Sequence, residues 1–487
     1  MSKQGYAGPL EQIDDCCWRI PVDYKTGMRV EGRIFADQRL LDQIRGDQAP
    51  EQVANVAFLP GIQMASLAMP DIHWGYGFCI GGVVATDPEA GGVISPGGVG
   101  YDINCGVRLV RTNLRRKDVQ PHLDALMDAL YRRIPAGVGE GGPYLFGGRE
   151  LERLLSEGSR YLASRGLATA DDLDCTEAGG CLPDARPDYV SPRALQRGGD
   201  QCGTLGSGNH FLEVQVVDEI FDADAARAMG VELGQVCVMI HSGSRGLGYQ
   251  VCDDALTALR KTPAKYGIDL PDRQLACAPV QSPEGQAYLG AMRSAANYAW
   301  ANRQLLMWQT REVFEEFFGR PWPVLDMQLV YDVAHNIAKM EEHEVQGHRR
   351  LLCVHRKGAT RSLPPGHPNV PEPYRAVGQP VLIPGDMGRA SWLLAGQPGS
   401  MTRSFGSSCH GAGRVMSRTA AVKNAEGRRI DRELAQQGVI AKCRNWKGLA
   451  EEQPAAYKDV DWVVDIVHRA GLARKVARLR PIGVVKG

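Results

Sequence analysis

The residues best suited to chemistry are histidine, cysteine and aspartate side chains that lie in or beside glycine-rich turns. Four separate segments carry them: the turn with Asp102 and Cys105, then His210, His241 and His335. Asp102 and Cys105 are three residues apart, so one turn can offer a carboxylate and a thiol to a single metal ion. Taken singly, each of these residues is more often a structural residue than a ligand. Dispersed ligands are nevertheless normal in metalloenzymes.

A fifth segment, Ser404–Arg414, places His410 among glycines, with Arg414 four residues later. A neutral imidazole is a competent nucleophile, and a guanidinium matches the geometry of phosphate oxygens. Glycines let backbone N–H groups approach an anion closely. The residues alone fit a glycine-rich connector at least equally well.

Familiar nucleotide-binding motifs are absent from the sequence. There is no GxxxxGK[ST] phosphate loop and no K-x-D-G motif with a lysine nucleophile, and Gly243–Gly248 resembles a dinucleotide fingerprint only loosely. Any nucleotide must therefore bind by a less common arrangement.

We expect short apolar runs to form buried strands that position these residues. Rigid strands carry catalytic and binding residues in the loops at their ends. The runs are 236–240, 351–354 and 381–383. We also expect a strand and a short helix in 28–44, no helix in the glycine-dense stretch 70–106, and a helix in 119–134. A long helix should begin after the N-cap Ser282 and end at Gly319, with a kink or break because of its length. The polar segment 168–200, and 171–199 within it, is predicted to be a loop insertion.

Composition narrows the class of protein. The 487 residues include 56 Lys plus Arg and 56 Asp plus Glu, so the net charge is zero and a broad nonspecific nucleic-acid coat is disfavoured. Thirteen cysteines occur without a CxxC pair, which favours free thiols in a reducing compartment. No apolar run is long enough for a membrane span, and no secretory signal begins the sequence. The expectation is a soluble, cytoplasmic protein, with nothing that demands more than a monomer.

Taken together, these segments resemble the RtcB family of RNA-splicing ligases. The resemblance runs in family order from about residue 70, through Pro70–Gly77, Gly98–Gly106, Gly206–Phe211, His241–Gly246, His335–Asn336, Ser408–Arg414 and Val484–Gly487. It implies an α+β fold in one domain, residues 1–487, with mixed β-sheets surrounded by helices. It also implies GTP- and Mn2+-dependent joining of RNA 3′-phosphate or 2′,3′-cyclic phosphate ends to 5′-hydroxyl ends. The settings would be tRNA splicing and RNA repair, often with the small protein archease as a partner.

Carried over residue by residue, the resemblance implies a two-manganese ligand set of Asp102, Cys105, His210, His241 and His335, with the Cys105 thiolate bridging the ions. It implies that His410 becomes guanylated and that Asp71 and Arg414 are catalytic, with Arg245 near phosphate or RNA. The positions implied to bind GTP are Asn209, Phe211, Glu213, Asn336, Asp386, Ser391, Ala412, Gly413, Tyr457 and Lys486.

Two features of the sequence do not agree directly with the family resemblance. Asp386 stands where a small hydroxyl residue is expected, and its carboxylate would repel GTP phosphates unless it pairs with a cation such as Arg389 or points away. A Cys/His site should also hold Zn2+ or Cu2+ more tightly than Mn2+, so manganese rests on the family resemblance.

Two other functions remain open: a metal-dependent phosphoesterase acting on RNA ends, and a non-ligating RNA-binding paralogue. The basic residues Arg474, Lys475, Arg478 and Arg480 could help to hold RNA, although a solvated helix face is the simpler interpretation.

Overall fold

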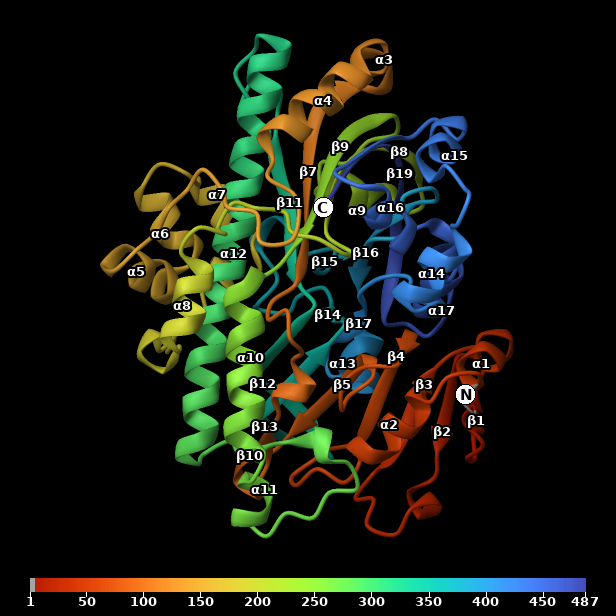
Figure 1. The fold of residues 1–487 in the computed structure, drawn as a ribbon. Helices are drawn as coiled ribbons and strands as arrows, with labels where there is room; N and C mark the ends of the chain where they lie inside the picture. Colours follow the sequence, from red (N-terminus) through yellow and green to blue (C-terminus); the bar gives the residue numbers. More distant parts are fainter. Residues whose placement is uncertain (1–4) are drawn as a thin grey trace.

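Two large mixed β-sheets form the body of the protein in the computed structural model, which describes residues 5–487 (Figure 1). The seven-stranded sheet has the spatial order β1 (Glu11–Asp14), β2 (Cys17–Ile20), β3 (Glu31–Phe35), β4 (Ala65–His73), β5 (Ile80–Thr86), β13 (His348–Lys357) and β12 (Asn336–Val345). The eight-stranded sheet has the order β11 (Gln328–Ala334), β7 (Gly106–Arg115), β9 (Gln235–Ser242), β8 (Phe211–Ile220), β19 (Ala473–Lys486), β16 (Ser391–Gly396) and β15 (Pro380–Ile383), with β18 (Ile440–Cys443) parallel to β19.

Two short ladders complete the strands. They pair β6 (Val93–Ile94) with β10 (Ala278–Pro279), and β14 (Ala359–Arg361) with β17 (Ser407–Cys409). Helices lie around both sheets, so the predicted α+β class with mixed sheets is confirmed.

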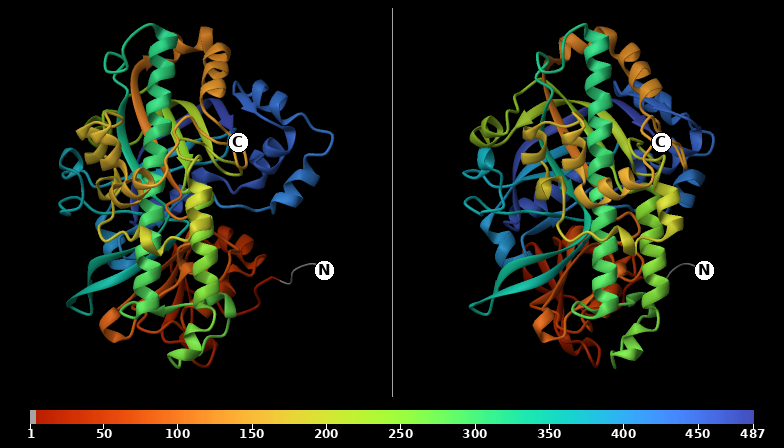
Figure 2. Two further views of the ribbon diagram at one scale, coloured as in Figure 1. Left: turned by 60° about the vertical axis from the view of Figure 1, so that its left-hand side comes forward. Right: turned by 90° about the vertical axis from the view of Figure 1, so that its left-hand side faces the viewer.

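The longest helix is α12 (Pro283–Phe318), which runs beside α10 (Arg245–Leu259) along one side of the molecule (Figure 2). The Ser282 hydroxyl accepts a hydrogen bond from the Gly285 N–H, and Gly319 ends the helix in the left-handed conformation, as predicted. The predicted break was wrong, because the helix is uninterrupted over 36 residues. Most of its middle is buried against other elements, and no proline or glycine lies between Gly290 and Gly319 to kink it.

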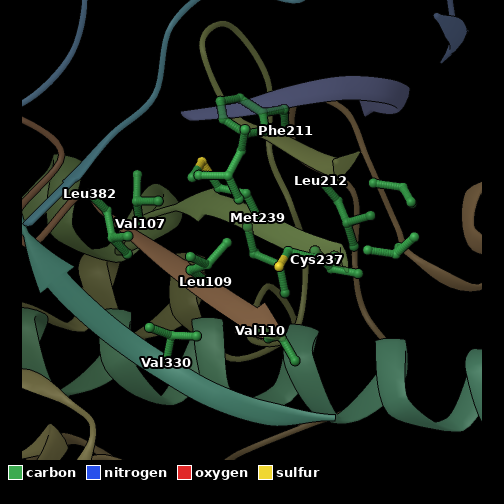
Figure 3. Close-up of a cluster of buried hydrophobic side chains, with 14 of the residues drawn as sticks. Val107, Leu109, Val110, Phe211, Leu212, Cys237, Met239, Val330 and Leu382 are labelled. Atoms are coloured by element: carbon green, nitrogen blue, oxygen red, sulfur yellow. The ribbon is translucent and has the colours of Figure 1, made fainter. Parts of the chain in front are cut away.

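The largest core lies against the eight-stranded sheet, where side chains of β7, β8, β9 and β11 pack together (Figure 3). Val107, Leu109, Leu212 and Met239 are fully buried there. Burial of each such side chain contributes about 1.5–3 kcal/mol. This packing makes the central strands a rigid support for whatever their ends present.

The segment 168–200 is ordered, and its description as a loop was wrong. It contains α7 (Ala170–Asp174) and α8 (Pro192–Gly198), and its acidic residues penetrate the core. Asp172 receives two hydrogen bonds of 2.8 Å from Arg311, and both side chains are fully buried. Burial raises the pKa of Asp172, but Arg311 outweighs it and lowers the pKa below its ordinary value. The polar residues that suggested a loop therefore include some that form buried ion pairs.

Two further helices lie where the sequence predicts them. The stretch 28–44 contains β3 and α1 (Gln38–Arg45), and 119–134 contains α4 (Leu123–Arg133), as predicted. The remaining α-helices are α2 (Ala49–Val56), α3 (Arg116–Val119), α5 (Arg149–Glu157), α6 (Ser159–Ser164), α9 (Ala223–Ala228), α11 (Thr262–Lys265), α13 (Pro398–Ser404), α14 (Arg418–Asn424), α15 (Ile430–Gln436), α16 (Trp446–Glu451) and α17 (Val460–Arg469). The predicted strands at 236–240, 351–354 and 381–383 are parts of β9, β13 and β15.

The basic residues at 474–480 lie on the strand β19, so the expected helix face was wrong. Arg474 pairs with Asp222, and Arg478 pairs with Asp218. These cations are therefore engaged in surface ion pairs. Within residues 5–487, no helix is long and apolar enough to cross a membrane.

Candidate metal centre and adjoining cavity

Strand register brings four of the predicted ligands to one edge of the eight-stranded sheet. Cys105 directly precedes β7 and His210 directly precedes β8, whereas His241 lies at the end of β9 and His335 directly follows β11. These four strands are neighbours and antiparallel, so the starts of two and the ends of two meet at the same edge. Gly106 lies opposite both Ser242 and Ala334, which fixes the alignment.

The side chains at this edge converge on one point. The Cys105 Sγ lies 3.1 Å from the His241 Nε2 and 3.5 Å from the His210 Nε2. The ligand atoms of these three residues all lie within 4.8 Å of one another, a spacing suited to a metal ion. The His210 Nε2 is 2.9 Å from the Asp102 Oδ2, which adds a carboxylate to the cluster.

His335 lies at the side of the same cluster. Its ring centre is 5.7 Å from that of His241 and 5.3 Å from that of His410. Both ring nitrogens are buried and have no hydrogen-bond partner. A buried imidazole without partners is costly in a protein interior, and metal binding would satisfy it. The residues present therefore fit a metal centre.

The electrostatics also suit a metal. Burial lowers the pKa of His241 and of His335 well below the ordinary value, so both rings are neutral and offer lone pairs. Burial, and then the neighbouring Asp102, raises the pKa of the Cys105 thiol. A cation in the centre would oppose both effects on the thiol and favour the thiolate.

A buried ion pair that the sequence did not reveal holds two of the ligand loops. The Arg303 guanidinium on α12 donates to the Asn104 carbonyl at 2.6 Å and to the Ser242 carbonyl at 3.1 Å. Asp332 accepts two bonds of 2.8 Å from the same guanidinium. Since Asn104 precedes Cys105 and Ser242 follows His241, Arg303 positions both ligands from behind. An arginine in the middle of a long helix carries no sequence signal for this role.

Close packing at the ligand loops requires a glycine at position 243. A Cβ there would lie 2.3 Å from the Asp102 Oδ1. Any side chain would thus displace the carboxylate. The glycines that looked like simple turn formers include at least one that makes room for a ligand.

A cavity of about 250 Å³ opens beside the cluster. Cys105, His241 and His335 reach it from the metal side. Most of the predicted nucleotide positions also line it, together with the predicted nucleophile and its neighbouring arginine: Asn209, Phe211, Glu213, Asn336, Asp386, His410, Ala412, Gly413, Arg414, Tyr457 and Lys486. The structure therefore brings together residues that are hundreds of positions apart in sequence, such as Cys105 and Lys486.

Asp71 lies beneath His410 and holds its ring. The His410 Nδ1–H donates to the Asp71 Oδ2 at 2.6 Å, and the backbone N–H groups of His410 and Gly411 donate to the same oxygen at 3.0 and 3.2 Å. Burial raises the pKa of Asp71, but the charge and hydrogen bonds of His410 lower it below its ordinary value. The carboxylate holds a proton on Nδ1, so Nε2 is the ring nitrogen that remains available to act as a nucleophile.

Of the residues predicted to contact GTP or RNA, Ser391 and Arg245 lie outside the cavity lining. The Ser391 hydroxyl accepts a 3.0 Å hydrogen bond from Gln215, whose side chain also donates to the Glu213 carboxylate at 2.7 Å. Ser391 therefore supports Glu213 from behind. Arg245 donates to the Thr204 hydroxyl at 3.1 Å and lies on the side of Asp102, whose charge it balances.

Glu452 and Arg418 also line the cavity and were missed, since neither belongs to a recognisable motif. The Glu452 carboxylate accepts hydrogen bonds from Arg414, at 3.0 Å, and from the Tyr457 hydroxyl. Burial raises the pKa of Glu452, but Lys486 and Arg414 lower it below the ordinary value. Arg414 is therefore tied to the cavity wall by a buried carboxylate.

The Asp386 carboxylate pairs with the guanidinium of Arg389, the cation expected from the sequence. The Arg389 Nε lies 3.5 Å from the Asp386 Oδ2, and the Gly388 N–H donates to Oδ1 at 2.9 Å. Arg389 is 41% exposed whereas the Asp386 side chain is fully buried, so the ion pair is weakened by water. Burial consequently dominates and raises the pKa of Asp386 to about 6.

Thiol, imidazole and carboxylate donors beside a cavity that holds an oriented histidine define a class of site: a metal centre adjoining a candidate nucleophile. The comparisons with known proteins give the family. The chain matches the family described as "tRNA-splicing ligase RtcB" over residues 52–487.

Individual relatives match over nearly the whole chain. A tRNA-splicing ligase RtcB of Thermococcus kodakarensis is 53% identical over 479 residues, which cover 98% of this chain and 99% of the relative. The protein of the same name from Archaeoglobus fulgidus is 54% identical over 99% of both chains. An RNA-splicing ligase RtcB of Mycobacterium tuberculosis is 55% identical over 90% of this chain and 100% of the relative. The chain belongs to the RtcB family.

Proposed function

We propose that this protein is an RNA ligase that joins 3′-phosphate or 2′,3′-cyclic phosphate ends to 5′-hydroxyl ends, with GTP as the co-substrate. The observation that carries the proposal is the Asp71–His410 pair, because a buried carboxylate holds the ring of a histidine that lines a cavity shared with a metal centre. A phosphoesterase would need the metal but not this oriented histidine. Family membership supports ligation over the alternatives.

In the proposed mechanism, His410 Nε2 attacks the α-phosphorus of GTP. A P–N bond forms, the P–O bond to pyrophosphate breaks, and pyrophosphate leaves with the electron pair. The Nδ1 proton stays on the ring and is shared with Asp71, which balances the positive charge that develops on the imidazole. Arg414 and Arg418 line the cavity and provide positive charge for phosphate oxygens.

The guanylate then passes from His410 to the RNA 3′-phosphate, after any cyclic phosphate has been hydrolysed. The 5′-hydroxyl oxygen attacks the activated 3′-phosphate, and GMP departs with the electron pair. The hydroxyl proton is released to solvent. Each transfer conserves the phosphates, so the sum converts one GTP into GMP and pyrophosphate for each bond joined.

Asp102, Cys105, His210, His241 and His335 would hold the metal, which we propose to be two Mn2+ ions. The metal supplies positive charge that neutralises phosphoryl oxygens during transfer. The donor set by itself would favour zinc. Manganese is therefore the part of the proposal that depends most on metal supply.

Glu213 suits a guanine base. Its carboxylate is buried in the cavity wall, where burial raises its pKa, and it can accept hydrogen bonds from both N1–H and N2–H. Lys486 lies on the same wall, 5.4 Å from the centre of the Phe211 ring. Preference for GTP over ATP should therefore fall in Glu213→Gln.

The cellular setting proposed for this activity is tRNA splicing or RNA repair in the cytoplasm, by a monomer. Broken RNA or tRNA halves would be the substrates, and archease would be an assisting partner. None of these points changes the chemistry at His410.

The test is incubation with GTP labelled at the α-phosphate in the presence of Mn2+. The wild type should acquire an acid-labile, alkali-stable label, as a phosphoramidate does, and His410→Ala should acquire none. The exposed His348 gives a matched control, and His348→Ala should label as the wild type does. Labelled enzyme should then join a 3′-phosphate RNA to a 5′-hydroxyl RNA.

Metal content must be measured on each sample, with zinc removed. An unlabelled wild type that contains manganese would refute the guanylation step. Removal of the RNA 3′-phosphate without joining would establish the phosphoesterase in its place, and RNA binding without either reaction would establish the non-ligating paralogue.

A further inference from the structure

Three tyrosines from separate elements form a continuous aromatic stack beside the metal centre. Tyr101 and Tyr249 are stacked face to face, with ring centres 4.8 Å apart and planes 25° apart. Tyr76 meets Tyr101 edge to face at 5.9 Å. The three come from the turn after β4, from the loop before β7 and from α10, so the tertiary fold assembles the stack. We call these three residues the tyrosine stack.

The tyrosine stack is fixed in place yet reaches the surface. Lys357 donates a 2.6 Å hydrogen bond to the Tyr76 carbonyl and anchors that turn. Tyr76 is 37% exposed and Tyr249 is 48% exposed. Arg197 on α8 lies 5.5 Å from the centre of the Tyr249 ring. A purely structural cluster would bury such rings, because each aromatic side chain has a large apolar area to remove from water.

Two of the proposed metal ligands do not line the nucleotide cavity, and the tyrosine stack includes the chain neighbour of one of them. Cys105, His241 and His335 face the cavity with the predicted nucleotide positions, but Asp102 and His210 do not line that cavity. The Asp102 side chain is instead 30% exposed. Tyr101 is the residue before Asp102, and Tyr249 lies one helical turn after Arg245. Asp102 is therefore partly exposed to solvent without lining the nucleotide cavity, and Tyr101 of the tyrosine stack is its neighbour in the chain.

We propose that the tyrosine stack is an RNA-binding platform, on which an unpaired base next to the ligation junction stacks. The proposal rests on the RNA ligase function proposed above, which requires RNA ends to reach the metal centre. Unpaired bases stack on exposed aromatic rings, and cations beside such rings hold the backbone phosphates. Tyr249 offers the most exposed ring of the three, and Arg197 supplies the neighbouring cation. Nucleotide enters from one side of the centre, and RNA from the other.

This role predicts a specific pattern of variants at Tyr249. Tyr249→Ala should raise the KM for RNA about 10-fold, which corresponds to the loss of one base stacked on an aromatic ring. Tyr249→Phe keeps the ring and should stay within about twofold of the wild type. Tyr249→Leu keeps apolar bulk against Tyr101 without a flat ring, and it should behave like Tyr249→Ala. Labelling with GTP needs no RNA and should persist in all three.

Tyr189 provides the matched control. It is also an exposed tyrosine, at 47%, with the Arg186 guanidinium 4.9 Å from its ring centre, but it does not belong to the stack. Tyr189→Ala should leave the KM for RNA unchanged. An equal rise in Tyr189→Ala would show a nonspecific effect of surface aromatics and would overturn the proposal.

A direct readout uses RNA with the fluorescent base 2-aminopurine at the last position of the 3′-phosphate strand or at the first position of the 5′-hydroxyl strand. Binding to the wild type and to Tyr249→Phe should quench one of these probes, and Tyr249→Ala and Tyr249→Leu should not quench it. Equal quenching by all four proteins, or a normal KM for Tyr249→Leu, would overturn the platform. Quenching by a wild type that neither labels with GTP nor ligates would refute the ligase function but keep the RNA contact.

Discussion

Replacement of Asp71 tests how His410 is activated, and the structure predicts a graded result. The Asp71 Oδ2 accepts three N–H groups, whereas Oδ1 is buried and has no hydrogen-bond partner. In Asp71→Asn the amide oxygen must take the place of Oδ2, because an NH2 group there would face three donors. The Nδ1 tautomer of His410 should therefore survive, and only the negative charge should be lost.

The size of the effect follows from the hydrogen-bond energies. A bond to a charged group is worth about 1.5–3 kcal/mol and a neutral one about 0.5–1.5 kcal/mol, so loss of the charge removes roughly 1–2 kcal/mol from the support of His410. Guanylation by Asp71→Asn should slow about 5- to 30-fold. Asp71→Ala also removes the orientation of the ring and should slow guanylation about 10³-fold. It strands two buried N–H groups, which should lower the free energy of unfolding by about 2–6 kcal/mol.

The assay is the rate at which label from GTP becomes acid-labile protein label, at fixed manganese content. Nitrogen-15 NMR of the histidines reports the tautomer of His410 in Asp71→Asn, and denaturant unfolding reports stability. If Asp71→Asn is as slow as Asp71→Ala while its tautomer is unchanged, or if it is as fast as the wild type, the reasoning about the three donors is wrong.

Three further outcomes are expected. Cys105→Ser should lose most bound metal, measured by mass spectrometry of the purified protein, because an alcohol does not replace a thiolate; full metal retention would contradict the assignment. Arg303→Met should bind metal about 10- to 100-fold more weakly and lose about 1–3 kcal/mol of stability, because the Asn104 and Ser242 carbonyls lose their donor while Asp332 keeps its ion pair with Arg108; normal affinity would remove Arg303 from its positioning role. Asp386, with its pKa raised from 3.8 to about 6, binds its proton more tightly when folded, so wild-type stability should fall as pH rises from about 4 to 6 and stay lower above that. Asp386→Asn should lack this fall and be more stable at pH 7 by up to roughly 3 kcal/mol in denaturant unfolding; an unchanged pH profile would refute it.

Particular helices and strands show how much of the fold could be predicted from the sequence. The strand that runs into His241 was readable, because buried strands are short apolar runs with turn residues at their ends. The N-cap Ser282 and the terminal Gly319 were readable because capping is local chemistry. The segment 168–200 was misread, because a polar composition does not distinguish solvated side chains from buried ion pairs such as Asp172 with Arg311.

The candidate site was also predicted from the sequence only in part. Residue types alone suggested ligands, and the motifs together indicated the family, but no local pattern showed that Cys105, His210 and His241 meet. Their meeting is decided by the antiparallel register of β7, β8 and β9, which is set by side-chain packing between strands far apart in sequence. The supports Arg303 and Glu452 were invisible for the same reason.

The sequence by itself therefore determined some of the elements and their caps, the donor types and the family, since each depends on neighbouring residues or on motifs in order. Only the tertiary structure decided which donors share a centre, that Asp71 holds His410, and that Asp386 is buried beside an exposed arginine. The contact between Asp71 and His410 joins residues 339 positions apart. Their geometry depends on how the packed sheets and helices close around one another, and local sequence does not encode that.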